Sequence, residues 1–220
     1  MSKVIVLDPG HGGNDSGALN GSRYEKNDNL RMAKAVKALL QKQGHTVLMT
    51  REDDSNPSYE ARIAVATKAK ADLFLSIHRN AHTDKTAKGI EIYARYSPHL
   101  AAMATILEEL AKEPNQANRG AKLGAYKVLY GATMPAGLIE IGFISNAEDN
   151  RLYDLHFDKY AEAIARGICY ALGVGYRTTL YGVAKQVIAL SDREAAEQYA
   201  AKLNREEKDG AYYKVIDIQK

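Results

Sequence analysis

The pattern that most constrains the fold is an alternation of strand-like and helix-like segments over residues 1–173. Short apolar runs such as Val4–Leu7 and Leu73–Ile77 are typical of buried strands. Longer segments with apolar residues at helical spacing separate these runs. This order is typical of a parallel sheet with helices packed on it. The sequence therefore predicts an α/β domain with a roughly six-stranded, mostly parallel sheet flanked by helices.

The same pattern predicts where the elements lie. Strands are expected at about 4–7, 45–50, 72–77, 89–94, 126–130 and 137–141, and helices at about 29–43, 59–70, 99–112 and 157–172. We assign residues 1–174 to one domain, 175–180 to a linker and 181–220 to a small C-terminal βαβ unit. A unit of about 40 residues is too small to bury its own core, so it must pack on another structure.

Composition excludes several classes of protein. The single cysteine, Cys169, rules out an intrachain disulfide framework and a Cys-rich zinc module. The net charge of +3 does not predict nucleic-acid binding, and would suit an anionic polymer such as a cell wall equally well. We expect no membrane insertion, because no apolar stretch approaches about 20 residues. The N-terminal apolar run is also too short for a secretory signal, so synthesis in the cytoplasm is expected.

A glycine-rich loop follows the first predicted strand. The loop runs from Gly10 to Gly21, and it places His11 at the carboxyl end of a strand, where open α/β sheets form their sites. Glycines let the backbone turn sharply and leave room for a substrate. A phosphate loop is excluded, because neither the G-x-G-x-x-G spacing nor a closing Gly-Lys-Ser/Thr is present.

A second histidine, His78, closes another predicted strand. Neighbouring parallel strands end at the same edge of a sheet, so His11 and His78 are expected to converge. Two imidazoles suit zinc, and a catalytic zinc needs a third protein ligand and an open position for water. Glu25, where the loop meets the first helix, is the candidate, and we predict one Zn²⁺ ion at these three residues. His82 lies on a loop after the strand and is disfavoured as a ligand.

Glu140 is a carboxylate within an apolar strand, flanked by Ile139, Ile141 and Phe143. Burial raises the pKa of a carboxyl group, which suits a general base that must become an acid within one reaction cycle. A structural ion pair is the alternative for this residue.

Together these segments resemble the zinc-dependent N-acetylmuramoyl-L-alanine amidases of the Amidase_3 family. The matching segments occur in family order and cover nearly all of residues 1–173: Leu7–Ala18, Glu25-Lys26, Thr50-Arg51, Ala71–Ala81 and Leu138–Asn146. The resemblance implies His11, Glu25 and His78 as zinc ligands and Glu140 as the catalytic carboxylate. Arg79 departs from the family pattern, which usually has a small residue there, and could touch the substrate.

The resemblance also implies the reaction. The substrate would be peptidoglycan, cut at the amide bond between the lactyl group of N-acetylmuramic acid and L-alanine of the stem peptide. Zinc would activate water, and Glu140 would take its proton and return one to the departing amine. Two alternatives remain at this point: a zinc peptidase acting within the stem peptide, and a non-catalytic wall-binding module.

The C-terminal segment resembles one half of a SPOR domain, a peptidoglycan-binding module, through Lys185–Leu190 and the helix expected after it. A full SPOR domain has two such halves, so we expect the tail either to form a homodimer with a second copy or to pack on the catalytic domain. Without a signal peptide, the enzyme would reach the wall after release, as an endolysin during host lysis or as an autolysin during mother-cell lysis.

Overall fold

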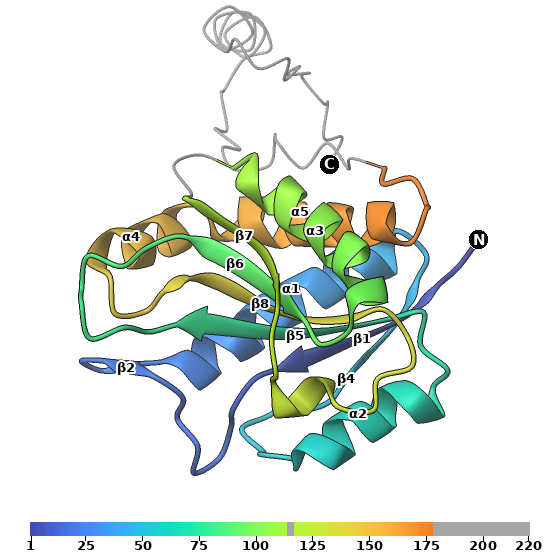
Figure 1. Cartoon of the computed structure of the whole chain (residues 1–220), viewed down its shortest axis with the longest axis horizontal. Coiled ribbons are helices and arrows are strands. Elements are labelled where there is room, and N and C mark those ends of the chain that lie inside the picture. The colour runs from blue at the N-terminus through green and yellow to red at the C-terminus, as the bar shows by residue number, and fades with distance from the viewer. Residues whose placement is uncertain (114–116, 178–220) are drawn as a thin grey trace, which may run out of the picture. The chain divides into compact units, whose positions relative to one another are not determined.

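A six-stranded sheet forms the centre of the fold (Figure 1). The computed structural model describes residues 1–113 and 117–177. The strands of the sheet are β1 (Val4–Pro9), β4 (Thr46–Met49), β5 (Leu73–Asn80), β6 (Ile90–Ala94), β7 (Asn118–Leu123) and β8 (Ala136–Phe143). Their order is β4-β1-β5-β8-β6-β7, and the first four are parallel. β6 is antiparallel to β8 and parallel to β7. The predicted fold class is confirmed.

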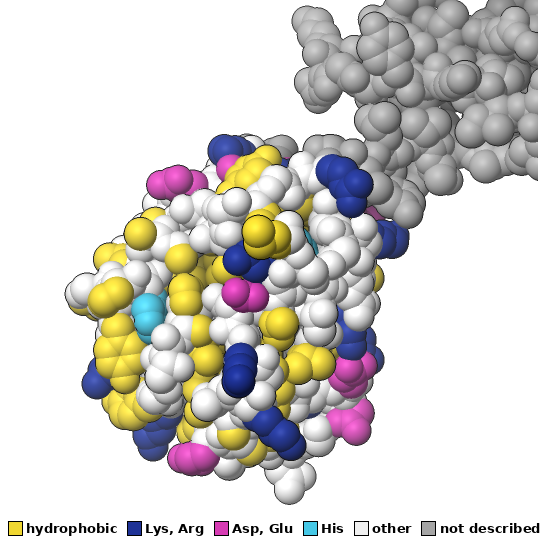
Figure 2. Space-filling view, turned by 90° about the vertical axis from the view of Figure 1, so that its right-hand side faces the viewer, with side chains coloured by type: hydrophobic (Ala, Val, Ile, Leu, Met, Phe, Trp, Pro, Cys, Tyr) yellow, Lys and Arg dark blue, Asp and Glu magenta, His cyan; other side chains and the backbone are white. Residues whose placement is uncertain are grey.

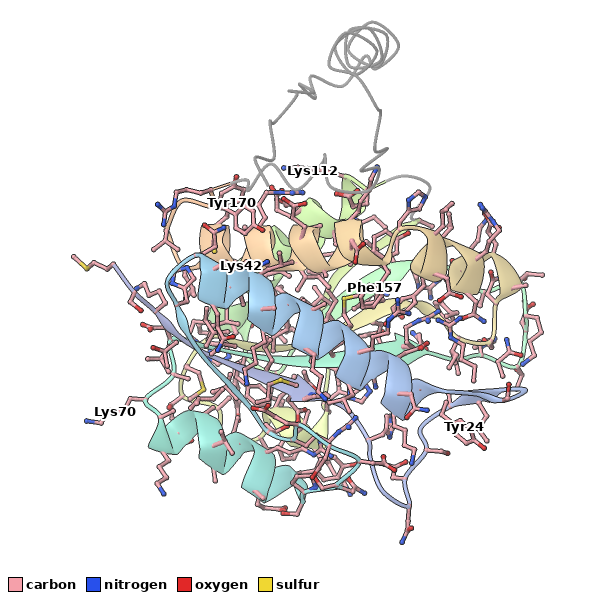
Figure 3. All side chains as sticks on the ribbon, turned by 180° about the vertical axis from the view of Figure 1, so that it is seen from behind. Tyr24, Lys42, Lys70, Lys112, Phe157 and Tyr170 are labelled. Carbon is pink, nitrogen blue, oxygen red and sulfur yellow. The ribbon has the colours of Figure 1, made fainter. Side chains whose placement is uncertain are left out.

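Helices cover both faces of this sheet. They are α1 (Glu25–Lys42), α2 (Tyr59–Lys68), α3 (Ser97–Ala111), α4 (Ala147–Leu155), α5 (Phe157–Ala171) and the 3₁₀ helix η1 (Lys127–Leu129). α1, α3 and α5 pack on one face, whereas α2 and η1 pack on the other. Figure 3 shows α1 and α5 side by side, seen from behind. A separate hairpin of β2 (Leu19–Asn20) and β3 (Arg23–Tyr24) precedes α1.

The central strands are buried on both faces. In β1, Ile5 and Leu7 join the larger core beneath α1, α3 and α5, and Val6 between them points into the smaller core beneath α2 and η1. A strand covered on both sides needs apolar residues at every position, so it reads as a continuous apolar run. This is why the sequence pattern located β1, β5 and β8.

One predicted element is wrong, and β7 and α4 were not predicted. The strand expected at 126–130 is wrong, because this segment contains the 3₁₀ helix η1, with Val128 and Leu129 buried. The pattern missed β7, a polar edge strand that lacks an apolar alternation. It also missed α4, whose buried residues include Leu152 and Tyr153. Short apolar runs are ambiguous, and here packing against neighbours decided the backbone conformation.

The predicted βαβ unit at 181–220 lies outside the described residues. Within the described ranges, every helix is too short or too polar to cross a bilayer. Figure 2 shows one face of the molecule, on which acidic and basic side chains are interspersed with hydrophobic ones. Among the described residues on that face, neither sign of charge forms a continuous patch.

Candidate metal centre and active-site pocket

The carboxyl ends of β1, β5 and β8 meet at one edge of the sheet. His78 and Glu140 are register partners on the adjacent strands β5 and β8. His11 lies two residues beyond the end of β1, on the other side of β5. The rings of His11 and His78 pack edge to face with their centroids 4.9 Å apart. The structure thus brings together the two histidines that sequence reasoning placed at neighbouring strand ends.

His11 is held in an unusual backbone conformation. Its φ angle is +61°, a left-handed conformation that non-glycine residues seldom adopt and that occurs preferentially at functional sites. Its Nδ1 lies 2.8 Å from Oδ2 of Asp15, and its Nε2 lies 3.3 Å from Oε1 of Glu25. A carboxylate on one ring nitrogen orients the other, which is typical of metal-binding histidines.

Glu25 occupies the first position of α1 and is buried. Its Oε1 lies 2.9 Å from Nδ1 of His78 and accepts hydrogen bonds from the backbone N–H of Arg79 and from Nδ2 of Asn29. Its Oε2 accepts a hydrogen bond from the backbone N–H of Ala18. Burial alone would raise the pKa of Glu25, but hydrogen bonds and charge from the two histidines hold it well below its usual value. The carboxylate is therefore ionised and fixed in position.

These three side chains fit a divalent metal ion. His11, Glu25 and His78 each offer one donor atom, and the three atoms lie within 4.8 Å of one another. Two ligands of a tetrahedral zinc, each about 2.0–2.1 Å from the metal, lie about 3.3 Å apart. The distances from Oε1 of Glu25, 3.3 Å to His11 and 2.9 Å to His78, are close to that separation. Two nitrogens and one carboxylate oxygen also match the ligands found at catalytic zinc sites.

Glu140 is buried beside this group. Its Oε2 has no hydrogen-bond partner, although buried polar atoms are nearly always paired. Burial raises the pKa of Glu140 well above its usual value, and the negative charges of Glu25 and Glu91 raise it further. Glu91 pairs with the nearby Arg119 and Lys122, whereas Glu140 has no such ion pair among the described residues. A structural ion pair therefore does not account for Glu140.

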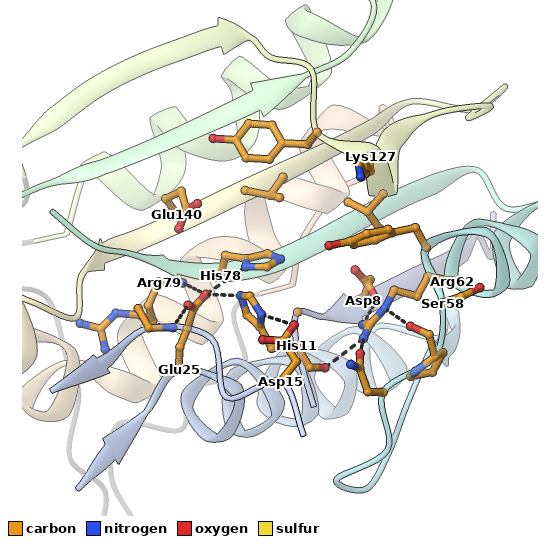
Figure 4. Close-up of a pocket in the computed structure, with 18 of the residues that line it drawn as sticks. Asp8, His11, Asp15, Glu25, Ser58, Arg62, His78, Arg79, Lys127 and Glu140 are labelled. Atoms are coloured by element: carbon orange, nitrogen blue, oxygen red, sulfur yellow. Dashed lines mark hydrogen bonds and ion pairs between the residues drawn. The ribbon is translucent and has the colours of Figure 1, made fainter. Parts of the chain in front are cut away.

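One pocket of about 720 Å³ joins all four residues (Figure 4). His11, Glu25, His78 and Glu140 line it at the strand ends. The opposite wall comes from the start of α2 and from η1, which contributes Lys127. The segment mispredicted as a strand thus forms part of the pocket. This volume would accommodate a substrate of the size of a peptide or a sugar with its substituent.

Sequence reasoning missed two residues, Asp15 and Asn29, that hold the candidate metal ligands in place. Asp15 orients His11, and its position four residues later in the same glycine loop was the available signal. Asn29 supports Glu25 from the next turn of α1, and only the helix register reveals it. Arg79 is among the residues that line the pocket, and its side chain is buried and bonds Asp28; a contact between Arg79 and the substrate stays a prediction. His82 lies outside the metal group, and its Nδ1 accepts a hydrogen bond from Asp84.

Comparison with known proteins agrees with this geometry. The family model described as N-acetylmuramoyl-L-alanine amidase, Amidase_3, matches residues 5–170. The chain belongs to this amidase family. The region matched by the model contains every residue of the candidate metal centre and Glu140.

Individual amidases are similar over most of the chain. The probable cell wall amidase LytH of Staphylococcus aureus is 38% identical over 173 residues, which are 76% of this chain and 58% of LytH. The chain therefore spans little more than half the length of that relative. The catalytic domain of the amidase CwlV from Paenibacillus polymyxa superimposes with a TM-score of 0.75 at 37% identity, covering 78% of this chain and 99% of the domain. The N-acetylmuramoyl-L-alanine amidase AmiC2 of Nostoc punctiforme superimposes with a TM-score of 0.74 at 33% identity. The match covers 78% of this chain and 97% of AmiC2.

Substitution of Gly10 tests how closely this amidase-family loop approaches His78. A Cβ atom at Gly10 would lie 2.1 Å from Cε1 and 2.2 Å from Nε2 of His78, so the imidazole must move. We expect Gly10→Ala to weaken zinc binding about tenfold or more, the effect of disturbing the support of a ligand. Zinc titration against a chromophoric chelator measures this. Gly175→Ala is the matched control, because its Cβ would meet nothing within 4 Å. Equal affinities for both variants would contradict the prediction.

Proposed function

We propose that this chain is a zinc-dependent peptidoglycan amidase that hydrolyses the amide bond between the lactyl group of N-acetylmuramic acid and L-alanine of the stem peptide. The observation that carries the proposal is the placement of three metal-binding side chains beside a buried carboxyl group in one pocket. Membership of the amidase family supports the choice of bond.

In this proposal His11, Glu25 and His78 hold one Zn²⁺ ion. The ion supplies Lewis-acid chemistry, which makes water more acidic and polarises an amide carbonyl. Asp15 fixes the orientation of the His11 ring, because its carboxylate lies 2.8 Å from Nδ1 and leaves Nε2 directed at Glu25. The backbone N–H groups of Ala18 and Arg79 and the amide of Asn29 hold the Glu25 carboxylate against the two imidazoles.

Glu140 is the proposed proton carrier. Its unpaired Oε2 is free to accept a proton from water entering the pocket. Burial raises the pKa of Glu140, so the carboxyl group retains the proton long enough to deliver it to the departing amine of L-alanine. A solvent-exposed glutamate would be a weaker base and would lose the proton to water.

Fragments released from purified peptidoglycan test the proposal. We expect mass spectrometry to find intact stem peptides with a free N-terminal L-alanine. Their release should stop on addition of a zinc chelator and return with added zinc, because catalysis depends on the metal. Fragments cut within the stem peptide would indicate a zinc peptidase instead. No release from several wall types would overturn the enzymatic proposal and favour a wall-binding module.

The remaining parts of the proposal rest on resemblance. That residues 181–220 bind the wall or join two copies of the chain stays a prediction. Release to the wall during host or mother-cell lysis is likewise proposed.

A further inference from the structure

The first turn of α1 carries a proposed zinc ligand and has no side-chain cap from the residue before it. Glu25 is its first residue, and the N-cap residue Tyr24 makes no side-chain hydrogen bond to the helix. The backbone N–H groups of Glu25 and Lys26 instead donate hydrogen bonds to the carbonyls of Ala18 and Ser16 in the preceding loop. A ligand at such a position needs contacts from elsewhere in the fold to stay in place.

Arg79 supplies such contacts from the adjacent strand. Its side chain is buried, and its Nη1 donates a hydrogen bond of 2.8 Å to Asp28, one turn along α1 from Glu25. Its Nη2 donates a hydrogen bond of 2.8 Å to Asn150 of α4. Burial lowers the pKa of Arg79, and the charge of Asp28 opposes that effect. One guanidinium group therefore joins α1, β5 and α4.

Two further residues close this cluster around the helix start. Arg23 bonds Asp28 through Nε at 2.6 Å and Asp154 of α4 through both Nη atoms at 2.9 Å. Tyr153 donates a hydrogen bond to the backbone carbonyl of Asp28, and the guanidinium of Arg79 lies 4.2 Å from the centre of its ring. The first turn of α1 is thus held from two sides by side chains outside the helix.

Arg79 is also directly linked to the proposed metal centre. It follows His78 in β5, and its backbone N–H donates a hydrogen bond of 3.1 Å to Oε1 of Glu25. Arg79 therefore contacts Glu25 through its main chain and Asp28 through its side chain. Movement of the side-chain contact would shift the helix turn relative to the strand that carries His78.

We propose that Arg79 is a positioning residue that fixes Glu25 for zinc binding by joining the start of α1 to β5 and α4. This inference rests on the proposed zinc site. The guanidinium fork is essential, because a lysine cannot reach Asp28 and Asn150 in the same geometry.

Zinc affinity of the full-length protein tests the inference. We expect Arg79→Met to weaken zinc binding about 10- to 100-fold, the range found when an outer partner of a metal ligand is removed. Arg79→Lys keeps the charge but loses the fork and should fall between Arg79→Met and the unmodified protein. The absorption spectrum of bound Co²⁺ provides a second measurement, because a displaced Glu25 changes the coordination geometry and hence the d–d bands.

Controls separate positioning from a general loss of stability. Arg151→Met removes an exposed arginine of α4 that pairs with Glu148, and should leave zinc affinity unchanged. If Arg79→Met does not fold, Arg23→Met removes the other, more exposed tie to Asp28 and should still weaken zinc binding. A folded Arg79→Met with unchanged zinc affinity and Co²⁺ spectrum overturns the inference. Failure of the unmodified protein to bind zinc would instead overturn the proposed function.

Discussion

Replacement of Glu140 by glutamine should reduce kcat about 10²- to 10⁴-fold, the contribution typical of a positioned general acid or base. Glutamine has nearly the same shape but cannot take up or release the proton. The expected zinc affinity is unchanged, because Glu140 lies outside the group formed by His11, Glu25 and His78. Single-turnover assays on purified peptidoglycan, combined with zinc titration, measure the two effects separately.

Glu148→Gln is the matched control for this experiment. Glu148 is exposed on α4 and pairs with Arg151, so its replacement should leave both kcat and zinc affinity unchanged. A Glu140→Gln variant that retains zinc and near-normal turnover would show that another group carries the proton. A variant that loses zinc would instead show that Glu140 belongs to the metal site.

Replacement of His78 by alanine should abolish both zinc binding and turnover. The substitution removes one of the two imidazoles among the candidate ligands His11, Glu25 and His78. It also removes the contact of 2.9 Å between Nδ1 of His78 and Oε1 of Glu25. We expect zinc affinity to fall by more than about a hundredfold, because even the loss of an outer partner costs up to that factor. Zinc titration and the peptidoglycan release assay measure the two losses.

His82→Ala is the control for His78, since it removes a histidine four residues later on the same segment. The ring of His82 takes part in a loop turn through Asp84, and we expect zinc affinity to stay unchanged. Loss of zinc in His82→Ala together with its retention in His78→Ala would reverse the assignment of the ligand.

Much of the site could be predicted because it lies at strand ends. A strand buried on both faces is recognisable as an apolar run, and the polar residue that ends it is easily found. His11 and His78 were located in this way, whereas Glu140 was recognised as a carboxylate inside an apolar strand. The strands β1, β5 and β8 are adjacent in the sheet, so these residues converge. Glu25 was harder to place, because the helix starts four residues earlier than the apolar pattern indicated.

The side-chain contacts that hold these site residues in position could not be predicted. Arg79 reads in sequence as a charged residue beside a candidate ligand, for which a substrate contact was a reasonable expectation. Its buried side chain depends on Asp28 in α1 and Asn150 in α4, which are 51 and 71 residues away in the chain. Since α4 was missed by the pattern, the partner in that helix could not be proposed.

The sequence by itself determined the α/β class, the central strands and the residue types offered at their carboxyl ends. Burial on both faces leaves a local apolar signal in each strand, and this signal needs no knowledge of distant neighbours. Only the tertiary structure decided the 3₁₀ conformation of Lys127–Leu129, the edge strand β7 and the ties around Arg79. Their conformations depend on contacts between segments far apart in the chain, and such contacts leave no periodic pattern in any one segment.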